Sequence, residues 1–70
     1  MSAEQFPERL RRLREQEGKS RVVLSQLCGL PSGAVRKYER GEAIPLSDSL
    51  EKMADYFGVS MDDLWGRENN

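Results

Sequence analysis

The sequence predicts a single all-α domain of five short helices. Apolar residues recur at helical spacing in successive segments, and no stretch alternates apolar and polar residues as a strand would. Glycine, which favours helix ends, follows four of these segments: Gly18, Gly29, Gly41 and Gly58. We therefore treat residues 1–70 as one domain, with a core over 6–66 and a short polar tail over 67–70.

The first helix is predicted from its proline and its apolar stripe. Pro7 suits the first turn of a helix, because backbone N–H groups there have no partner within the helix and the missing N–H of proline costs no hydrogen bond. Phe6, Leu10 and Leu13 follow the i, i+4, i+7 pattern of one helix face. The chain before this helix is expected to be a loose lead-in, and Gly18 ends the helix.

A second, short helix is predicted from the Ser20 cap to about Cys28. Leu24 and Cys28 lie four apart and are expected to face the core. Ser25 is small enough to let another helix approach closely. Gly29 then supplies a left-handed turn, which gives the layout of a helix-turn-helix.

The third helix is predicted over about 32–40, and the rest of the chain is organised around it. Leu30 fills the corner before it, and Val35 and Tyr38 fall on its core side. The opposite side is basic and rich in small residues, so it suits a groove lined with phosphates. That side consists of Ser32, Gly33, Arg36, Lys37 and Arg40.

Two more helices complete the prediction. The fourth begins at Leu46 or Ser47 and ends at Gly58, and its apolar stripe is Leu50, Met53, Ala54 and Phe57. Ser60 caps a last helix over Met61–Trp65.

Charge and composition narrow the function classes. Residues 1–41 carry nine Lys or Arg against five Asp or Glu, whereas residues 42–70 carry two against seven. This asymmetry suits a protein that presents one face to DNA. With no histidine and only Cys28 as a thiol, we expect no enzyme activity, no metal site and no cofactor. No membrane span or signal peptide is predicted, so the expected location is the cytoplasm.

These residues resemble the Cro/lambda-repressor-like family of helix-turn-helix regulators (the XRE type). The resemblance covers residues 6–67 and depends on the order and spacing of Leu13-Arg14, Gly18, Leu24, Gly29-Leu30, Val35, Tyr38-Glu39-Arg40-Gly41, Pro45 and Asp55-Tyr56-Phe57-Gly58-Val59-Ser60. It implies a five-helix DNA-binding domain with the third helix in the major groove, and a sequence-specific transcriptional regulator that acts as a repressor. The sequence looks most like the small regulators borne by phages and mobile elements of Gram-positive bacteria.

The resemblance also implies roles for single residues. Ser32, Gly33, Arg36 and Lys37 match groove-facing positions, and Arg21 matches a phosphate contact. Arg14 and Glu39 match an internal salt bridge between the first and third helices. Arg40 is expected to contact the DNA backbone or to remain plain surface.

Three departures from the family pattern affect this interpretation. Pro31 stands where the family has a capping Ser or Thr, so Ser32 is a candidate cap instead of a base contact, and Gly33 permits only a close backbone approach. Positions that are typically polar are apolar here, and they are either covered or form a partner site. These are Val22, Val23 and Leu27.

The C-terminal aromatic residue has two interpretations. Trp65 either closes the core over Phe57 together with Leu64, or is exposed with Met61 as a homodimer contact on a pseudo-palindromic DNA site. A second function class also remains open, an antitoxin-like protein-interaction module that regulates its own synthesis through DNA. No small-molecule ligand is predicted.

Overall fold

The computed structural model describes residues 4–66, and within that range it contains five helices and no strand. The helices are α1 (Phe6–Glu17), α2 (Arg21–Leu27), α3 (Ala34–Glu39), α4 (Ser47–Phe57) and α5 (Met61–Trp65). The predicted all-α, five-helix class is therefore confirmed. The predictions for the first residues of the lead-in and for the tail over 67–70 lie outside the described residues. No helix in the described range has the length and apolar character needed to cross a membrane.

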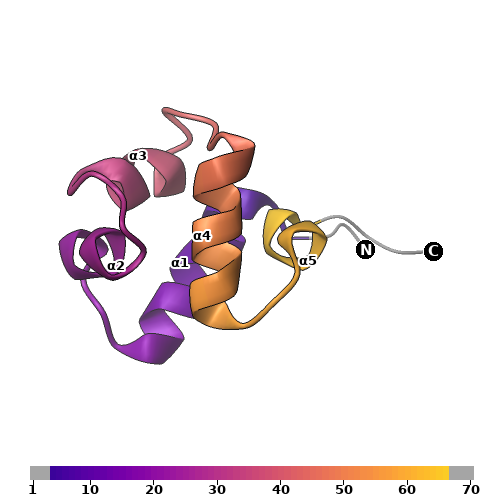
Figure 1. The fold of residues 1–70 in the computed structure, drawn as a ribbon, viewed down its shortest axis with the longest axis horizontal. Helices are drawn as coiled ribbons and strands as arrows, with labels where there is room; N and C mark the ends of the chain where they lie inside the picture. Colours follow the sequence, from indigo (N-terminus) through magenta and orange to yellow (C-terminus); the bar gives the residue numbers. More distant parts are fainter. Residues whose placement is uncertain (1–3, 67–70) are drawn as a thin grey trace.

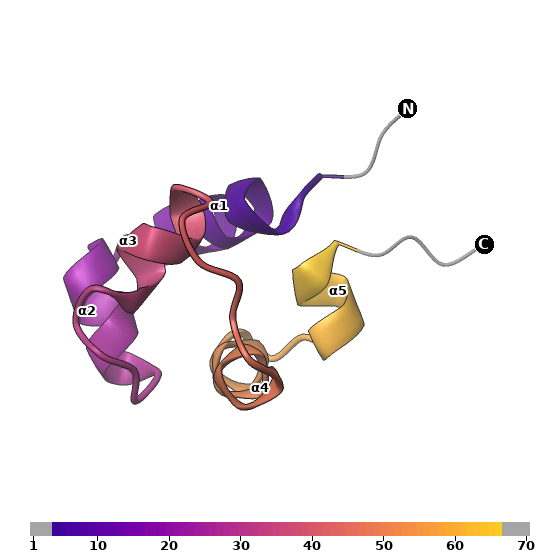
Figure 2. The same ribbon diagram turned by 90° about the horizontal axis from the view of Figure 1, so that it is seen from above.

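The helices are arranged around α1. It packs against α3 on one side and α5 on the other, while α2 packs against α3 and α4 against α5. Figure 1 shows α4 crossing in front of α1, with α2 and α3 to one side and α5 to the other. Seen from above in Figure 2, α4 lies on the opposite side of the molecule from α1 and α3.

Each helix contributes one fully buried apolar side chain to the core. Burying an aliphatic side chain of this size stabilises the fold by roughly 1.5–3 kcal/mol, so each helix is anchored by an apolar contact. These side chains are Leu10, Leu24, Val35, Met53 and Leu64. Leu30 and Cys28 are also buried, as the sequence predicts.

The predicted caps of α2 and α5 form. The Ser20 hydroxyl accepts a hydrogen bond from the backbone N–H of Val23 at 3.1 Å, and the Ser60 hydroxyl accepts one from Asp63 at 3.0 Å. Gly29 has a φ of +73°, the left-handed conformation that the turn between α2 and α3 requires.

The start of the third helix differs from the prediction. It begins at Ala34, and its N-cap is Gly33, with no side chain capping the helix. The backbone N–H of Ala34 instead bonds to the Pro31 carbonyl at 3.0 Å, so Pro31–Gly33 form a turn in front of the helix. The helix predicted over about 32–40 is therefore shorter, and the interpretation of Ser32 as its cap is wrong.

Candidate nucleic-acid interface

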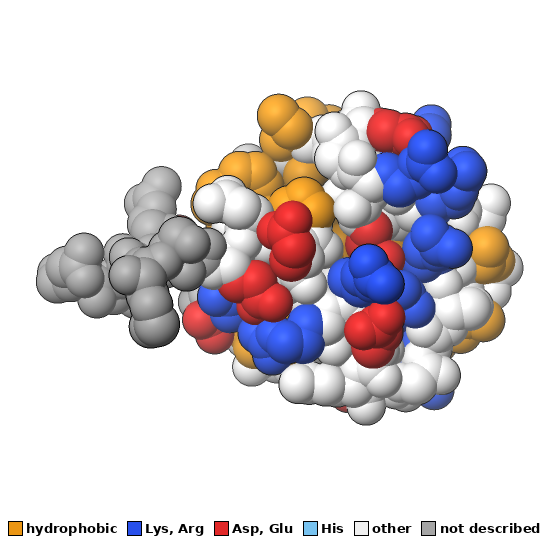
Figure 3. Space-filling view, turned by 180° about the vertical axis from the view of Figure 1, so that it is seen from behind, with side chains coloured by type: hydrophobic (Ala, Val, Ile, Leu, Met, Phe, Trp, Pro, Cys, Tyr) orange, Lys and Arg blue, Asp and Glu red, His pale blue; other side chains and the backbone are white. Residues whose placement is uncertain are grey.

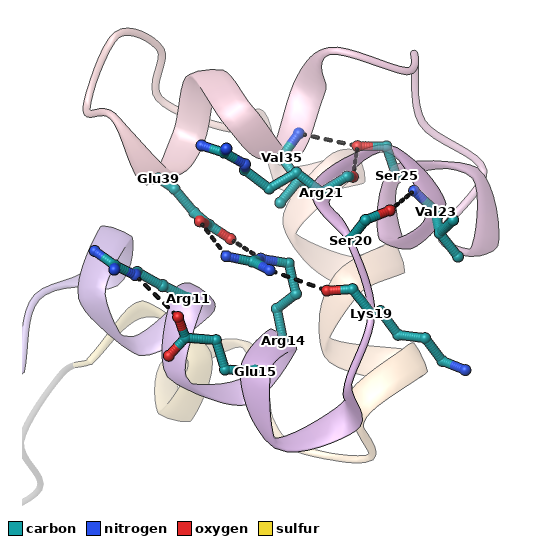
Figure 4. Close-up of polar contacts among 10 residues, drawn as sticks. All are labelled: Arg11, Arg14, Glu15, Lys19, Ser20, Arg21, Val23, Ser25, Val35 and Glu39. Atoms are coloured by element: carbon teal, nitrogen blue, oxygen red, sulfur yellow. Dashed lines mark hydrogen bonds and ion pairs between the residues drawn. The ribbon is translucent and has the colours of Figure 1, made fainter.

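A buried serine fixes the position of α3 relative to α2. The Ser25 hydroxyl donates to the Arg21 carbonyl at 2.9 Å and accepts from the backbone N–H of Val35 at 3.1 Å (Figure 4). The N–H of Val35 lies in the first turn of α3, where a helix has no backbone acceptor of its own. Ser25 therefore supplies a partner for a buried polar group and a bond between the two helices.

A second polar contact fixes the other end of α3. Arg14 in α1 donates to both carboxylate oxygens of Glu39, with Nε–Oε2 at 2.6 Å and Nη2–Oε1 at 3.1 Å. Its Nη1 also donates to the Lys19 carbonyl at 2.9 Å, as Figure 4 shows. The side chains are only 14% and 5% exposed. The hydrogen bond to Glu39 raises the pKa of Arg14, so the guanidinium keeps its charge. Its bonds tie α3 to α1 and to the chain that leads into α2.

With both ends fixed, α3 presents the basic surface that the sequence predicts. Ala34 and Val35 are buried, whereas Arg36 and Lys37 are exposed, as are Ser32 and Gly33 in the preceding turn. Neither Arg36 nor Lys37 forms an ion pair with another residue in 4–66. Their charges are therefore available to an external ligand.

The two flanking arginines differ from each other. Arg21 is exposed at the start of α2 and forms no ion pair with the other described residues. Arg40 follows α3 and is paired with Glu42, with Nε–Oε2 at 2.5 Å. Figure 3 shows Lys and Arg side chains gathered on the side of the molecule that carries α2 and α3, with acidic side chains among them.

The structure adds Arg11, which the sequence analysis did not single out. Arg11 in α1 lines one hollow together with Arg14, Arg21, Glu39 and Arg40. The signal available in the sequence was the i, i+3 spacing of Arg11 and Arg14, which places both on one side of α1.

Trp65 agrees in part with each of the two interpretations given from the sequence, because it is partly exposed and also packs on the core. Leu64 is fully buried, whereas Trp65 is 39% exposed. The indole stacks on Phe6, with ring centroids 5.3 Å apart and planes at 25°. It therefore closes the core over Phe6 at the start of α1, and the prediction of Phe57 as its neighbour is wrong. Met61 is partly buried against the core.

Two apolar surfaces are exposed. Val22, Val23 and Leu27 on α2 are 50%, 40% and 52% exposed, so within the described structure they form a patch and are not covered. Ile44 and Leu46, in the loop after α3, are more exposed still and were not singled out from the sequence. Ile44 lines two hollows with Trp65, one of which also includes Met61.

Neither a metal-binding cluster nor an exposed thiol occurs in the described range. Residues 4–66 contain no group of three or more Cys, Asp or Glu side chains placed to hold a metal ion. Cys28 is buried, and burial raises the pKa of its thiol, which disfavours the reactive thiolate.

Comparison with known families identifies this arrangement. The family model described as "Helix-turn-helix" matches residues 10–64, which is most of the chain. The chain belongs to the helix-turn-helix family. The resemblance noted from the sequence is thereby confirmed, and α2 and α3 are the two helices of the motif.

A phage transcriptional repressor is similar to this chain in sequence. The chain is 35% identical over 60 residues to the cryptic phage CTXphi transcriptional repressor RstR of Vibrio cholerae serotype O1; the match covers 86% of this chain and 54% of that protein. The chain thus spans about half the length of this curated relative.

Solved structures agree on the fold. The P22 c2 repressor in complex with synthetic operator 9T superposes with a TM-score of 0.84 at 23% identity, over 93% of this chain and 98% of that one. The restriction-modification controller protein C.AhdI of Aeromonas hydrophila gives a TM-score of 0.77 at 32% identity, over 84% and 89% of the two chains.

Proposed function

We propose that this chain binds double-stranded DNA in a sequence-specific manner and regulates transcription, with repression as the mode of action. In this proposal α3 lies in the major groove, with Arg36 and Lys37 as its principal contacts and Ser32 and Gly33 against the DNA. Arg21 and Arg40 contact backbone phosphates. Membership of the helix-turn-helix family supports this, as do a phage repressor among its relatives and an operator complex among its structural neighbours.

The proposal depends most on one observation: α3 is held in a fixed position and carries basic side chains that form no ion pair with the described residues. Arg36 and Lys37 are exposed and form no ion pair with the described residues, while Ser25 and Arg14 fix the two ends of the helix. An arginine held in this way is able to grip guanine with two hydrogen bonds, which discriminates between bases by about 1–3 kcal/mol.

The proposal extends to assembly and location. A single helix as short as α3 reads few base pairs, so we propose that residues 1–70 form one domain that binds as a homodimer to a pseudo-palindromic operator. The partner surface is the side that carries Met61 and the exposed part of Trp65. Such a regulator acts in the cytoplasm, needs no cofactor and catalyses no reaction.

One observation favours a second candidate. The exposed patch of Val22, Val23 and Leu27 lies on α2. DNA binding does not require exposed apolar side chains on this helix, whereas a protein partner does. An antitoxin-like protein that binds a partner through this patch, and DNA for autoregulation, would have the same surface. Substitution of Val23 by Asp then abolishes capture of the partner but leaves DNA binding intact.

The dependence of DNA affinity on salt tests the proposed function. We expect log Kd for one duplex to rise linearly with log salt concentration over about 50–200 mM, because each neutralised phosphate releases counterions. Arg21→Ala should weaken binding to all duplexes alike and reduce the slope, whereas Arg36→Ala should also relax the preference at one base position. We expect this salt dependence even though the chain has a net charge of −1. An affinity that does not change with salt would contradict the proposal.

A further inference from the structure

The hollow beside α3 is a candidate site in its own right. It has a volume of about 230 Å³ and is lined by Arg11, Arg14, Arg21, Glu39 and Arg40. Four guanidinium groups and one carboxylate give it an excess of positive charge. These residues come from α1, from α2 and from the end of α3 and the residue after it.

Its charged groups divide into two sets. Arg14 and Glu39 are largely buried and neutralise each other at 2.6 Å, so they form a fixed base for the hollow. Arg11, Arg21 and Arg40 are exposed and supply the excess charge. Figure 4 shows the Arg14–Glu39 pair lying between the side chains of Arg21 and Arg11. Since Arg40 directly follows α3, the hollow adjoins the end of the proposed recognition helix.

Two of the exposed arginines have acidic neighbours. Arg11 Nε lies 3.3 Å from Glu15 Oε2, and Arg40 Nε lies 2.5 Å from Glu42 Oε2. Ion pairs this exposed contribute little to stability, so the arginines can exchange them for a better acceptor. A phosphate group is such an acceptor, because guanidinium groups bind its oxygens bidentately.

We propose that this hollow binds one backbone phosphate of the DNA, with Arg11 as a contact residue beside Arg21 and Arg40, and that Glu42 weakens binding by holding Arg40. This inference rests on the proposed function and adds a contact from α1. The phosphate belongs to a duplex and is not a free ion, because a duplex already held by α3 presents its phosphate at a high effective concentration. A free phosphate has to compete with Glu15 and Glu42 without that advantage.

The test is the salt slope of duplex binding, measured by fluorescence anisotropy for single variants of the full chain. Arg11→Ala should reduce the slope of log K against log salt by about 0.9, the value for one phosphate contact. Arg12→Ala is the matched control, since it removes the same charge from the next residue of α1, where Arg12 pairs with Glu4 at 2.9 Å. We expect Arg12→Ala to leave the slope unchanged.

The proposed effect of Glu42 is tested in the opposite direction. Glu42→Gln should tighten binding to specific and nonspecific duplexes alike, whereas Glu51→Gln, the same charge change on the exposed side of α4, should have little effect. In a third arm, inorganic phosphate replaces chloride at constant ionic strength, and we expect no added loss of duplex binding.

The possible results separate the two claims. If the native chain binds a duplex but Arg11→Ala and Arg12→Ala change the slope equally, the phosphate site is wrong and the proposed function stands. Specific displacement of the duplex by inorganic phosphate would mean that the hollow is a site for the free ion, which would also overturn the inference. If the native chain binds no duplex, the proposed function itself fails. Circular dichroism of each variant verifies that it is folded.

Discussion

The Ser25 hydroxyl and the Val35 backbone N–H lie 3.1 Å apart in a buried hydrogen bond that links α2 to the first turn of α3. Few side chains could replace this serine. Alanine would leave the N–H without a partner, and a larger residue would push the two helices apart. The bond therefore sets the position of the proposed recognition helix before any DNA is present.

Ser25→Ala should destabilise the fold by about 1–3 kcal/mol, because it leaves a buried donor unsatisfied. Ser20→Ala, which removes the α2 cap, should cost about 1 kcal/mol without disturbing α3. Denaturant unfolding gives both values, and amide hydrogen exchange at Val35 separates the mechanisms. Exchange at Val35 should be faster only in Ser25→Ala; equal exchange in both variants would contradict this role.

Glu39→Gln should lower the free energy of unfolding by about 3 kcal/mol. It leaves the largely buried Arg14 guanidinium without its charged partner, and removing one member of a buried pair costs about 3–5 kcal/mol. We take the low end because Arg14 keeps some contact with solvent. Glu42→Gln breaks an exposed pair and should change stability by less than about 1 kcal/mol. Similar small losses in thermal melts of both variants would show that the Arg14–Glu39 pair contributes little.

Stability at acid pH should depend on Glu4. Hydrogen bonds from Arg12, at 3.0 and 3.2 Å, lower the pKa of Glu4 below its usual value. A lowered pKa in the folded state means that the contribution is present above the unfolded pKa, about 4.3, and is lost as pH falls through the folded value. Glu4→Gln should therefore reduce the drop in melting temperature between about pH 6 and pH 3. Glu8→Gln is the control, since exposed Glu8 pairs with no described residue.

Cooperative binding to a two-fold site should depend on Trp65 and Ile44, which line the same hollows. Trp65→Ala also removes the stack on Phe6, so Ile44→Asp is the cleaner variant, because the Ile44 side chain is 79% exposed and is not part of the hydrophobic core. Both variants should lose affinity for a full site and keep affinity for a half-site. Val23→Asp, on the opposite apolar patch, should behave like the native chain. If Ile44→Asp binds the full site cooperatively, the partner surface lies elsewhere.

Local signals in the sequence predicted the helices well. The Ser20 and Ser60 caps and the Gly29 turn depend on neighbours a few residues away, so they are readable without a structure. The start of α3 was misplaced because Pro31 and Ser32 each suit a first helical turn, but the backbone forms a separate turn there.

Contacts between distant residues were harder to predict. Phe6 lies beside Trp65 only because α5 packs on the start of α1, a packing that no spacing rule gives. The small size of Ser25 predicted the close approach of another helix. Its hydrogen bond to Val35 was not predicted, because it depends on where α3 lies. Arg11 was not predicted as a site residue, because its neighbours in the hollow come from three helices and are defined only once these helices pack together.

Selection from a pool of randomised duplexes, carried out with the native chain and with Arg36→Ala, tests the central claim most directly. The account predicts that the native chain enriches a pseudo-palindrome with half-sites about one helical turn apart. It also predicts that Arg36→Ala loses the preference at one base pair in each half-site, at a cost of about 1–3 kcal/mol. No enriched sequence, or the same sequence with undiminished preference from both proteins, would contradict the claim that α3 reads DNA through Arg36.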